Sequence, residues 1–138
     1  MKSFADYNDA PALRQALDEL ISQMIQTGVF KPADLTGIAK KDIQIPTRDG
    51  ASIRAIHYRS ESGPDGPLLV HFHGGGFVVG YAEGYEAGFE ILTKELGFTV
   101  VSVDYRMAPE HVFPTAATDS IDAVHWVSST AEPTPESG

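Results

Sequence analysis

The stretch LLVHFHGGGFVVG, residues 68–80, joins an apolar run to three consecutive glycines. Its opening run and the later run FTVVSV (98–103) have the nearly continuous apolar character of strands covered on both faces. Between them, AGFEILTKELG (87–97) has apolar residues at helical spacing and ends at Gly97. Strand, helix and strand in this order predict a βαβ unit whose two strands are parallel.

The three glycines follow the first of these strands directly. In open α/β sheets, ligands bind at the carboxyl ends of the parallel strands. Consecutive glycines can adopt positive φ, so successive N–H groups can converge on one point, and no Cβ blocks the approach of a ligand oxygen. Two such donors aimed at a developing oxyanion would stabilise it by about 3–4 kcal/mol each. The triplet therefore predicts a binding or catalytic loop.

Two elements are expected before this unit. DAPALRQALDELISQMIQTG (9–28) is typical of an amphipathic helix, capped by Asp9 and ended by Gly28. KDIQIPTRDGASIRAIHYR (41–59) alternates apolar and polar residues around the turn signal Asp49–Gly50, which predicts a β-hairpin. Pro46 favours an edge position for its first strand.

A further helix is expected after the βαβ unit. TAATDSIDAVHWVSS (115–129) carries one apolar side formed by Ala117, Ile121, Val124 and Val127. The tail TAEPTPESG (130–138) is linker-like. The predicted fold class is therefore α/β, a mostly parallel sheet with an amino-terminal antiparallel hairpin and flanking helices.

Composition narrows the class of protein. The 138 residues suit one globular domain, with 42% hydrophobic and 21% charged residues. A net charge of −9 without a basic stripe argues against nucleic acid as a partner. The absence of cysteine excludes disulfides and thiolate chemistry. The apolar runs are too short to span a membrane, and no apolar signal core opens the chain, so we expect a cytoplasmic protein.

HGGGF (73–77) and DYRMAPEHVFPTA (104–116) together resemble the hormone-sensitive-lipase-like group of α/β-hydrolases, in which an HGGG-type loop supplies the oxyanion donors. The similarity runs from about Lys41, and the helix before it is similar to the amino-terminal cap segment of that group. The resemblance implies a cap-like helical segment over 1–40. It also implies that residues 41–138 form an incomplete α/β-hydrolase domain, its amino-terminal half.

The resemblance also implies roles for single residues. The N–H groups of Gly74 and Gly75 would be the oxyanion donors, His73 and Gly76 would shape the loop, and Phe77 would pack beneath it. A structural signature beside the site, holding the loop after the next strand, would comprise Tyr105, Arg106, Pro109 and Glu110. The activity implied is hydrolysis of a small carboxylic ester by a Ser–His–Asp triad, without metal or organic cofactor.

The nucleophile is the point at which this sequence departs from the group. A nucleophilic serine needs a G-x-S-x-G elbow, and none of the ten serines lies in one. In the order of the group, all three triad members follow the glycine loop and would fall beyond Gly138. We therefore expect this chain alone to be inactive. We also expect self-association, because the strand at 68–72 would keep an open edge.

Several alternatives stay open at this stage. His71 and His73 alternate along one strand and could suggest a metal pair, but no third ligand is near in sequence. His57, His111 and His125 are candidate bases, although packing or surface roles fit them better. Asp104 ends a strand at the ligand-binding edge, where a catalytic acid and a structural residue are both conceivable. A non-catalytic, receptor-like binding protein of the same fold is the alternative function.

Overall fold

The computed structural model describes residues 9–63 and 65–130, and confirms the predicted α/β class. Of the predicted tail (130–138), Thr130 is instead the last residue of a helix, and residues 131–138 lie outside the described residues. Along the chain the elements are α1 (Ala10–Gln26), β1 (Ile38–Pro46), β2 (Ser52–Ser60), β3 (Leu68–Phe72), the 3₁₀ helix η2 (Ala82–Tyr85), α2 (Glu86–Lys94), β4 (Thr99–Val103) and α3 (Thr115–Thr130).

The described strands form one mixed sheet in the order β1-β2-β4-β3. The predicted hairpin is confirmed, with β1 antiparallel to β2 from Ile38↔Ser60 to Pro46↔Ser52. β2 is also antiparallel to β4, whereas β3 and β4 are parallel from Leu68↔Thr99 to Phe72↔Val103. The predicted βαβ unit is therefore present, and the hairpin supplies the antiparallel part of the sheet.

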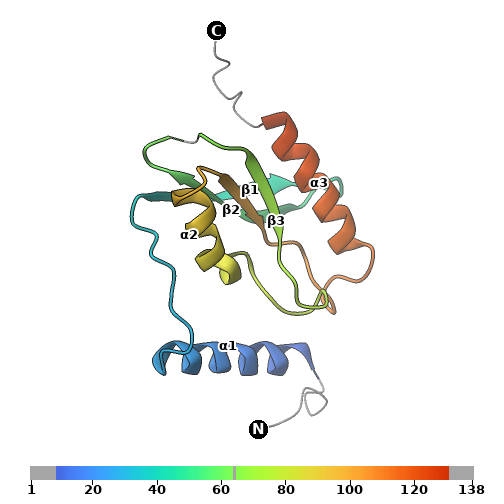
Figure 1. Ribbon diagram of the computed structural model, residues 1–138. Coiled ribbons are helices and arrows are strands. Elements are labelled where there is room, and N and C mark those ends of the chain that lie inside the picture. Colours follow the sequence, from blue (N-terminus) through green and yellow to red (C-terminus); the bar gives the residue numbers. More distant parts are fainter. Residues whose placement is uncertain (1–8, 64, 131–138) are drawn as a thin grey trace.

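Helices α2 and α3 cover opposite faces of the sheet (Figure 1). Phe89 of α2 packs into the cluster that contains Ile56, Tyr58 and Val100. On the other face, Ala123 and Val127 of α3 join a cluster of buried side chains from β1, β2 and β4, made of Ile45, Ile53, Ala55, Val101 and Val103. These two clusters hold the strand ends, and hence the following loops, in a fixed arrangement.

The apolar side predicted for α3 is wrong in part. Val127 faces the sheet as expected, together with Ala123 and the carboxylate of Asp119. Ile121 and Val124 are 49% and 43% exposed, and they border a shallow hollow beside Phe72. Helical spacing identifies residues that share a side, but this helix has apolar residues on two sides, and only one of them packs on the described sheet.

The two outer strands differ in burial. β1 lies at one edge, as Pro46 predicted, and β3 lies at the other. Every residue of β4 is buried, whereas β3 is only half-buried and Leu68 is 41% exposed, so the expectation that both runs are covered on both faces is wrong for β3. Because the described residues place no strand beyond β3, self-association through this edge stays a prediction.

Helix α1 lies beyond the loops at one end of the sheet, apart from the two helices that cover its faces (Figure 1). Asp9 caps it, as predicted, by accepting a hydrogen bond from the Ala12 N–H at 2.7 Å. None of its residues is buried. Within the described ranges, no helix is both long and apolar enough to cross a membrane.

Candidate active site

The residues that follow β3, His73 to Gly80, form a loop at the carboxyl ends of the two parallel strands. We call this segment the glycine loop. It lies beside the segment that follows β4, Asp104 to Pro114, which we call the β4 loop, and the two are joined by a hydrogen bond from Ala108 N–H to the Phe77 carbonyl at 2.9 Å. The sheet therefore brings together the two sequence motifs that lie about thirty residues apart in the chain.

Two buried aromatic side chains lie beneath the glycine loop. The rings of His73 and Tyr105 are stacked, with centroids 4.4 Å apart, and both residues are buried. The single hydroxyl proton of Tyr105 is donated to the His73 carbonyl oxygen at 2.6 Å. His73 Nδ1 lies 2.8 Å from the Gly74 carbonyl oxygen, and since a carbonyl only accepts, Nδ1 carries the proton. The other ring nitrogen, Nε2, is buried without a partner among the described residues.

A third carbonyl of the loop is also held by the protein. The Gly75 carbonyl accepts hydrogen bonds from the N–H groups of Val78 and Val79, at 3.2 and 3.1 Å. The carbonyl groups of three successive peptides, at His73, Gly74 and Gly75, are thus all occupied.

These occupied carbonyls determine the direction of the neighbouring donors. In a trans peptide the C=O and the following N–H point in opposite directions. The N–H groups of Gly74, Gly75 and Gly76 therefore point away from Tyr105, His73 and the Val78–Val79 turn. Within the described residues no acceptor receives any of the three, and all three glycines are exposed. The loop offers a row of unoccupied main-chain donors at the surface.

Glycine is required at two positions of this loop. Gly75 has φ of 131°, and a Cβ there would overlap the carbonyl oxygen of Val79. Gly80 has φ of 102°, and a Cβ there would overlap His73 Nδ1 and the Gly74 carbonyl oxygen. A side chain at Gly80 would displace the Gly74 carbonyl, which directs a donor, and a side chain at Gly75 would displace Val79, whose N–H holds the Gly75 carbonyl.

Phe77 does not pack beneath the loop as expected. Its side chain is 61% exposed, and its backbone has φ of 62°, a left-handed conformation that is uncommon for a residue with a Cβ. The ring keeps only an edge contact with Tyr105, with centroids 6.2 Å apart. The left-handed backbone turns the ring outward, and the space beneath the loop is filled by His73 and Tyr105 instead.

The β4 loop is held by ion pairs. Arg106 binds the buried carboxylate of Asp119 on α3 through both Nε and Nη2, and it also pairs with Asp49 of the hairpin turn at 2.9 Å. Asp104 accepts hydrogen bonds from Ala82 N–H and from Arg54, at 2.6 and 2.9 Å. Both oxygens of Asp104 are thereby occupied, which favours the structural interpretation of this residue.

Helix α1 contributes one side chain to this region that no local sequence pattern identifies. Arg14 donates to the Val78 carbonyl of the glycine loop at 2.7 Å and to the Ala108 carbonyl of the β4 loop at 2.9 Å. It also forms an ion pair with Glu110 at 2.5 Å, which lowers the pKa of Glu110 to about 2. The partners are 64 to 96 residues away in sequence, so no local pattern indicates them.

Three other candidate histidines are packed against the sheet or exposed. His71 faces Ser102 at 3.2 Å and packs against Tyr85 and Phe89, and burial is the main cause that lowers its pKa, with His73 adding to it. His111 and His125 are exposed. Across residues 9–63 and 65–130, no three His, Cys, Asp or Glu side chains are grouped so that they could hold a metal ion.

Four serines of the sheet and of α3 give their hydroxyl protons to main-chain carbonyls, and this includes Ser102, which therefore accepts from His71 Nδ1 instead of donating to it. Ser120, Ser128 and Ser129 donate to main-chain carbonyls of their own helix, and buried Ser102 donates to the Ala82 carbonyl at 2.8 Å. The glycine loop therefore provides donors for a negatively charged oxygen, and the described residues place no activated nucleophile beside it.

Comparison with known proteins relates this arrangement to a family. A family model described as the alpha/beta hydrolase fold matches residues 69–137, half of the chain. An AB hydrolase superfamily protein of Schizosaccharomyces pombe is 37% identical over 122 residues, and an arylesterase of Saccharolobus solfataricus is 34% identical over 119 residues. These matches cover 87% and 86% of this chain.

Solved structures give a matching result. A hyperthermophilic esterase from Pyrobaculum calidifontis superposes with a TM-score of 0.73 and 36% identity, over 91% of this chain and 39% of the esterase. The chain spans only 35% and 36% of the length of the two curated relatives. The similarity therefore covers nearly all of this chain and little more than a third of each relative.

Proposed function

The chain belongs to the α/β-hydrolase fold family, among carboxylesterase and arylesterase relatives, and from this we propose that it supplies the oxyanion hole of a carboxylic ester hydrolase. The donors are the N–H groups of Gly74 and Gly75, with His73 and Gly76 as supporting residues. The nucleophile, acid and base lie beyond Gly138. The cap-like segment lies before β1 and the incomplete hydrolase domain begins with β1, so the boundary is a few residues earlier than the predicted 40/41, because Ile38 to Lys40 already pair with β2.

One observation carries this proposal: three successive carbonyls of the glycine loop are held by the protein, and the following N–H groups have no acceptor within the described residues. Attack on an ester carbonyl moves negative charge onto its oxygen. Fixed donors at that oxygen stabilise the tetrahedral intermediate, and loss of one donor typically costs about 3–4 kcal/mol of barrier. Since the donors are already oriented, no rearrangement is needed during the reaction.

The chemistry requires a serine attack and a histidine that moves the proton from the serine to the leaving alcohol. Neither the glycine loop nor the β4 loop contains a serine. The purified 138-residue chain is therefore expected to hydrolyse p-nitrophenyl butyrate no faster than the buffer. Turnover that can be titrated with an active-site reagent would contradict the placement of the triad beyond Gly138.

A hybrid esterase tests the donors themselves. It consists of residues 1–138 joined to the part of the Pyrobaculum calidifontis esterase that follows the superposed segment. We expect the hybrid to hydrolyse p-nitrophenyl butyrate and to lose that activity on the change Gly75→Ala. A hybrid that folds, as judged by its circular dichroism spectrum and a cooperative melt, and yet is inactive would contradict the proposal.

The coding sequence downstream of Gly138 distinguishes an enzyme from a binding protein of the same fold. An in-frame G-x-S-x-G within a few tens of codons supports an esterase. Another residue in place of the serine supports a receptor-like protein that keeps the pocket without catalysis.

A further inference from the structure

We propose that Arg14 of α1 is a positioning residue for the oxyanion donors, which it orients by holding the glycine loop and the β4 loop together. This inference rests on the proposed function of the glycine loop. It assigns to α1 a role beyond covering the site, because a single guanidinium reaches main-chain atoms of both loops.

The guanidinium of Arg14 binds three different groups of the two loops. Its Nε donates to the Val78 carbonyl at 2.7 Å, its Nη2 to the Ala108 carbonyl at 2.9 Å, and both Nη atoms reach the Glu110 carboxylate, at 2.5 and 3.1 Å. The planar guanidinium has five N–H donors in a fixed fork, so one side chain satisfies all three partners together. A lysine ammonium is a single point and reaches them less completely.

The two residues whose carbonyls Arg14 binds also hold the glycine loop through their own N–H groups. The N–H groups of Val78 and Val79 donate to the Gly75 carbonyl, and the Phe77 carbonyl accepts from Ala108 N–H. Arg14 binds the carbonyls of Val78 and Ala108, next to both of these links. If the guanidinium is lost, the turn at 77–79 can shift, the Gly75 carbonyl loses its partners, and Gly75, whose own N–H is a proposed donor, is no longer held in place.

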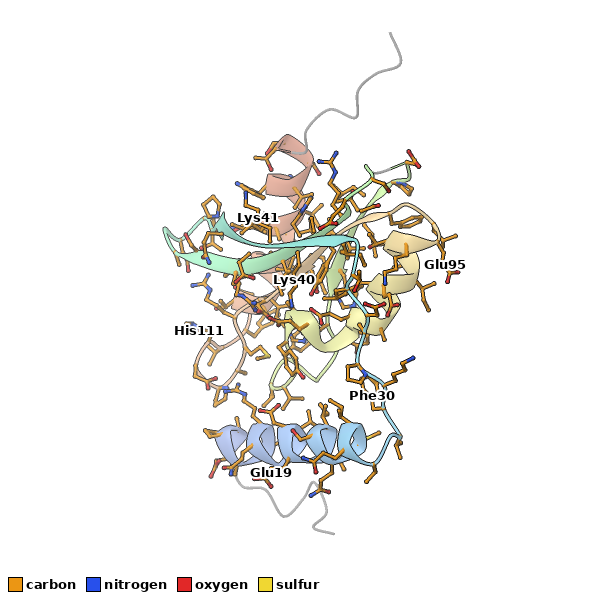
Figure 2. The ribbon with its side chains drawn as sticks, turned by 90° about the vertical axis from the view of Figure 1, so that its left-hand side faces the viewer. Glu19, Phe30, Lys40, Lys41, Glu95 and His111 are labelled. Atoms are coloured by element: carbon orange, nitrogen blue, oxygen red, sulfur yellow. The ribbon has the colours of Figure 1, made fainter. Side chains whose placement is uncertain are left out.

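Because of the position of α1, loss of the Arg14 guanidinium can loosen the two loops without lowering the stability of the whole fold. No residue of α1 is buried, and the helix lies against the two loops without joining either core cluster (Figure 2). The β4 loop, in which Figure 2 labels His111, extends toward the same helix. Removal of one polar side chain from α1 should therefore loosen the loops while the sheet stays folded.

The direct test measures amide hydrogen exchange in the 138-residue chain after the change Arg14→Met, which keeps the apolar stem. We expect exchange at Val78, Val79 and Ala108 to become about tenfold faster, the factor that corresponds to one lost charged hydrogen bond, with Val101 in the sheet unchanged. Arg14→Lys is expected to give a smaller increase, and it keeps the test valid if the methionine variant fails to fold.

The matched control is Arg48→Met. The Arg48 side chain also donates to a carboxylate, that of Asp122 on α3, through Nε and Nη2, and among the described residues it makes no hydrogen bond to the glycine loop or the β4 loop. Its loss should leave exchange at Val78, Val79 and Ala108 unchanged. Equal exchange in the Arg14→Met and parent chains, or an equal acceleration in both methionine variants, would overturn the proposal.

The kinetic test uses the hybrid esterase. Arg14→Met should lower kcat about tenfold with KM within about twofold, because donors that act on the transition state are misdirected while the ester still binds. Faster loop exchange with an unchanged kcat would overturn the positioning role. An inactive parent hybrid would instead count against the proposed function, and the exchange measurement on the 138-residue chain would still decide whether Arg14 holds the loops.

Discussion

The glycine-containing turns that follow β1 and β3 use their peptides in opposite ways. The hairpin turn after β1 contains Gly50, with φ of 86°, and its donors are occupied: Gly50 N–H binds the Thr47 carbonyl, and Thr47 N–H binds the Ala51 carbonyl. In the glycine loop after β3 the carbonyls are occupied and the glycine N–H groups are not. Positive φ alone is therefore no sign of a site, and the proposed oxyanion hole rests on the unoccupied N–H groups that follow occupied carbonyls.

The largest expected difference between the two turns comes from adding one methyl group to each. In the hybrid esterase, Gly75→Ala should lower kcat/KM by about 100-fold or more, because the new Cβ displaces the Val79 carbonyl and the donors with it. Gly50→Ala meets no atom within 4 Å and should cost only about 1 kcal/mol of unfolding free energy, with activity retained. Initial rates and urea unfolding measure the two effects. Similar losses of activity in both variants would remove the distinction between the turns.

A smaller effect is expected from the hydroxyl that directs the Gly74 donor. Tyr105→Phe removes the hydrogen bond to the His73 carbonyl and should lower kcat of the hybrid about tenfold. Tyr58→Phe is the matched control, since its buried hydroxyl binds the Glu86 carboxylate at 2.7 Å and not a carbonyl of the glycine loop. It should reduce unfolding free energy by about 1–2 kcal/mol without changing kcat. A kcat that falls equally in both variants would show a general loss of stability rather than a loss of donor orientation.

The smallest effect concerns the ion pair that supports the glycine loop. Arg14 holds the pKa of Glu110 at about 2, below the value near 4.3 expected in the unfolded chain. Because the folded value is the lower one, the stabilisation is fully present above about pH 4.3 and is lost as pH falls toward 2. Carbon-13 NMR titration should show the Glu110 midpoint rising toward its ordinary value in Arg14→Met.

Asp122 provides the internal reference for that titration. Its pKa is lowered by Arg48, which Arg14→Met leaves in place, so its midpoint should not move. A Glu110 midpoint that is the same in the parent and in Arg14→Met would mean that the ion pair does not hold the β4 loop in solution.

Local patterns predicted much of this fold. Alternation around Asp49–Gly50 identified the hairpin, and the Asp9 cap identified the start of α1. The glycines at 74–76 marked the loop because their chemistry is visible in the residue type itself. What failed depends on neighbours distant in sequence. The packing side of α3 is set by which side meets the sheet, and the outward turn of Phe77 is set by the rings of His73 and Tyr105 beneath the loop.

Arg14 is a clearer example of a residue whose role depends on neighbours distant in sequence. Within α1 it is one polar residue among several, and nothing near it in sequence distinguishes it from Gln15 or Asp18. Its importance arises because two loops, from later parts of the chain, end beside one turn of the helix. Only the three-dimensional arrangement reveals that convergence.

The donors of the glycine loop are main-chain N–H groups, so substitutions there act differently from substitutions of a catalytic side chain. At an ordinary catalytic residue, truncation to alanine deletes the active group, and larger substitutions vary in effect. At Gly75 and Gly80 there is no group to delete, and every substitution inserts atoms where carbonyls already lie. In a saturation scan of this loop, the loss of activity should therefore follow the size of the new side chain and not its chemical type. Alanine should already be among the damaging changes.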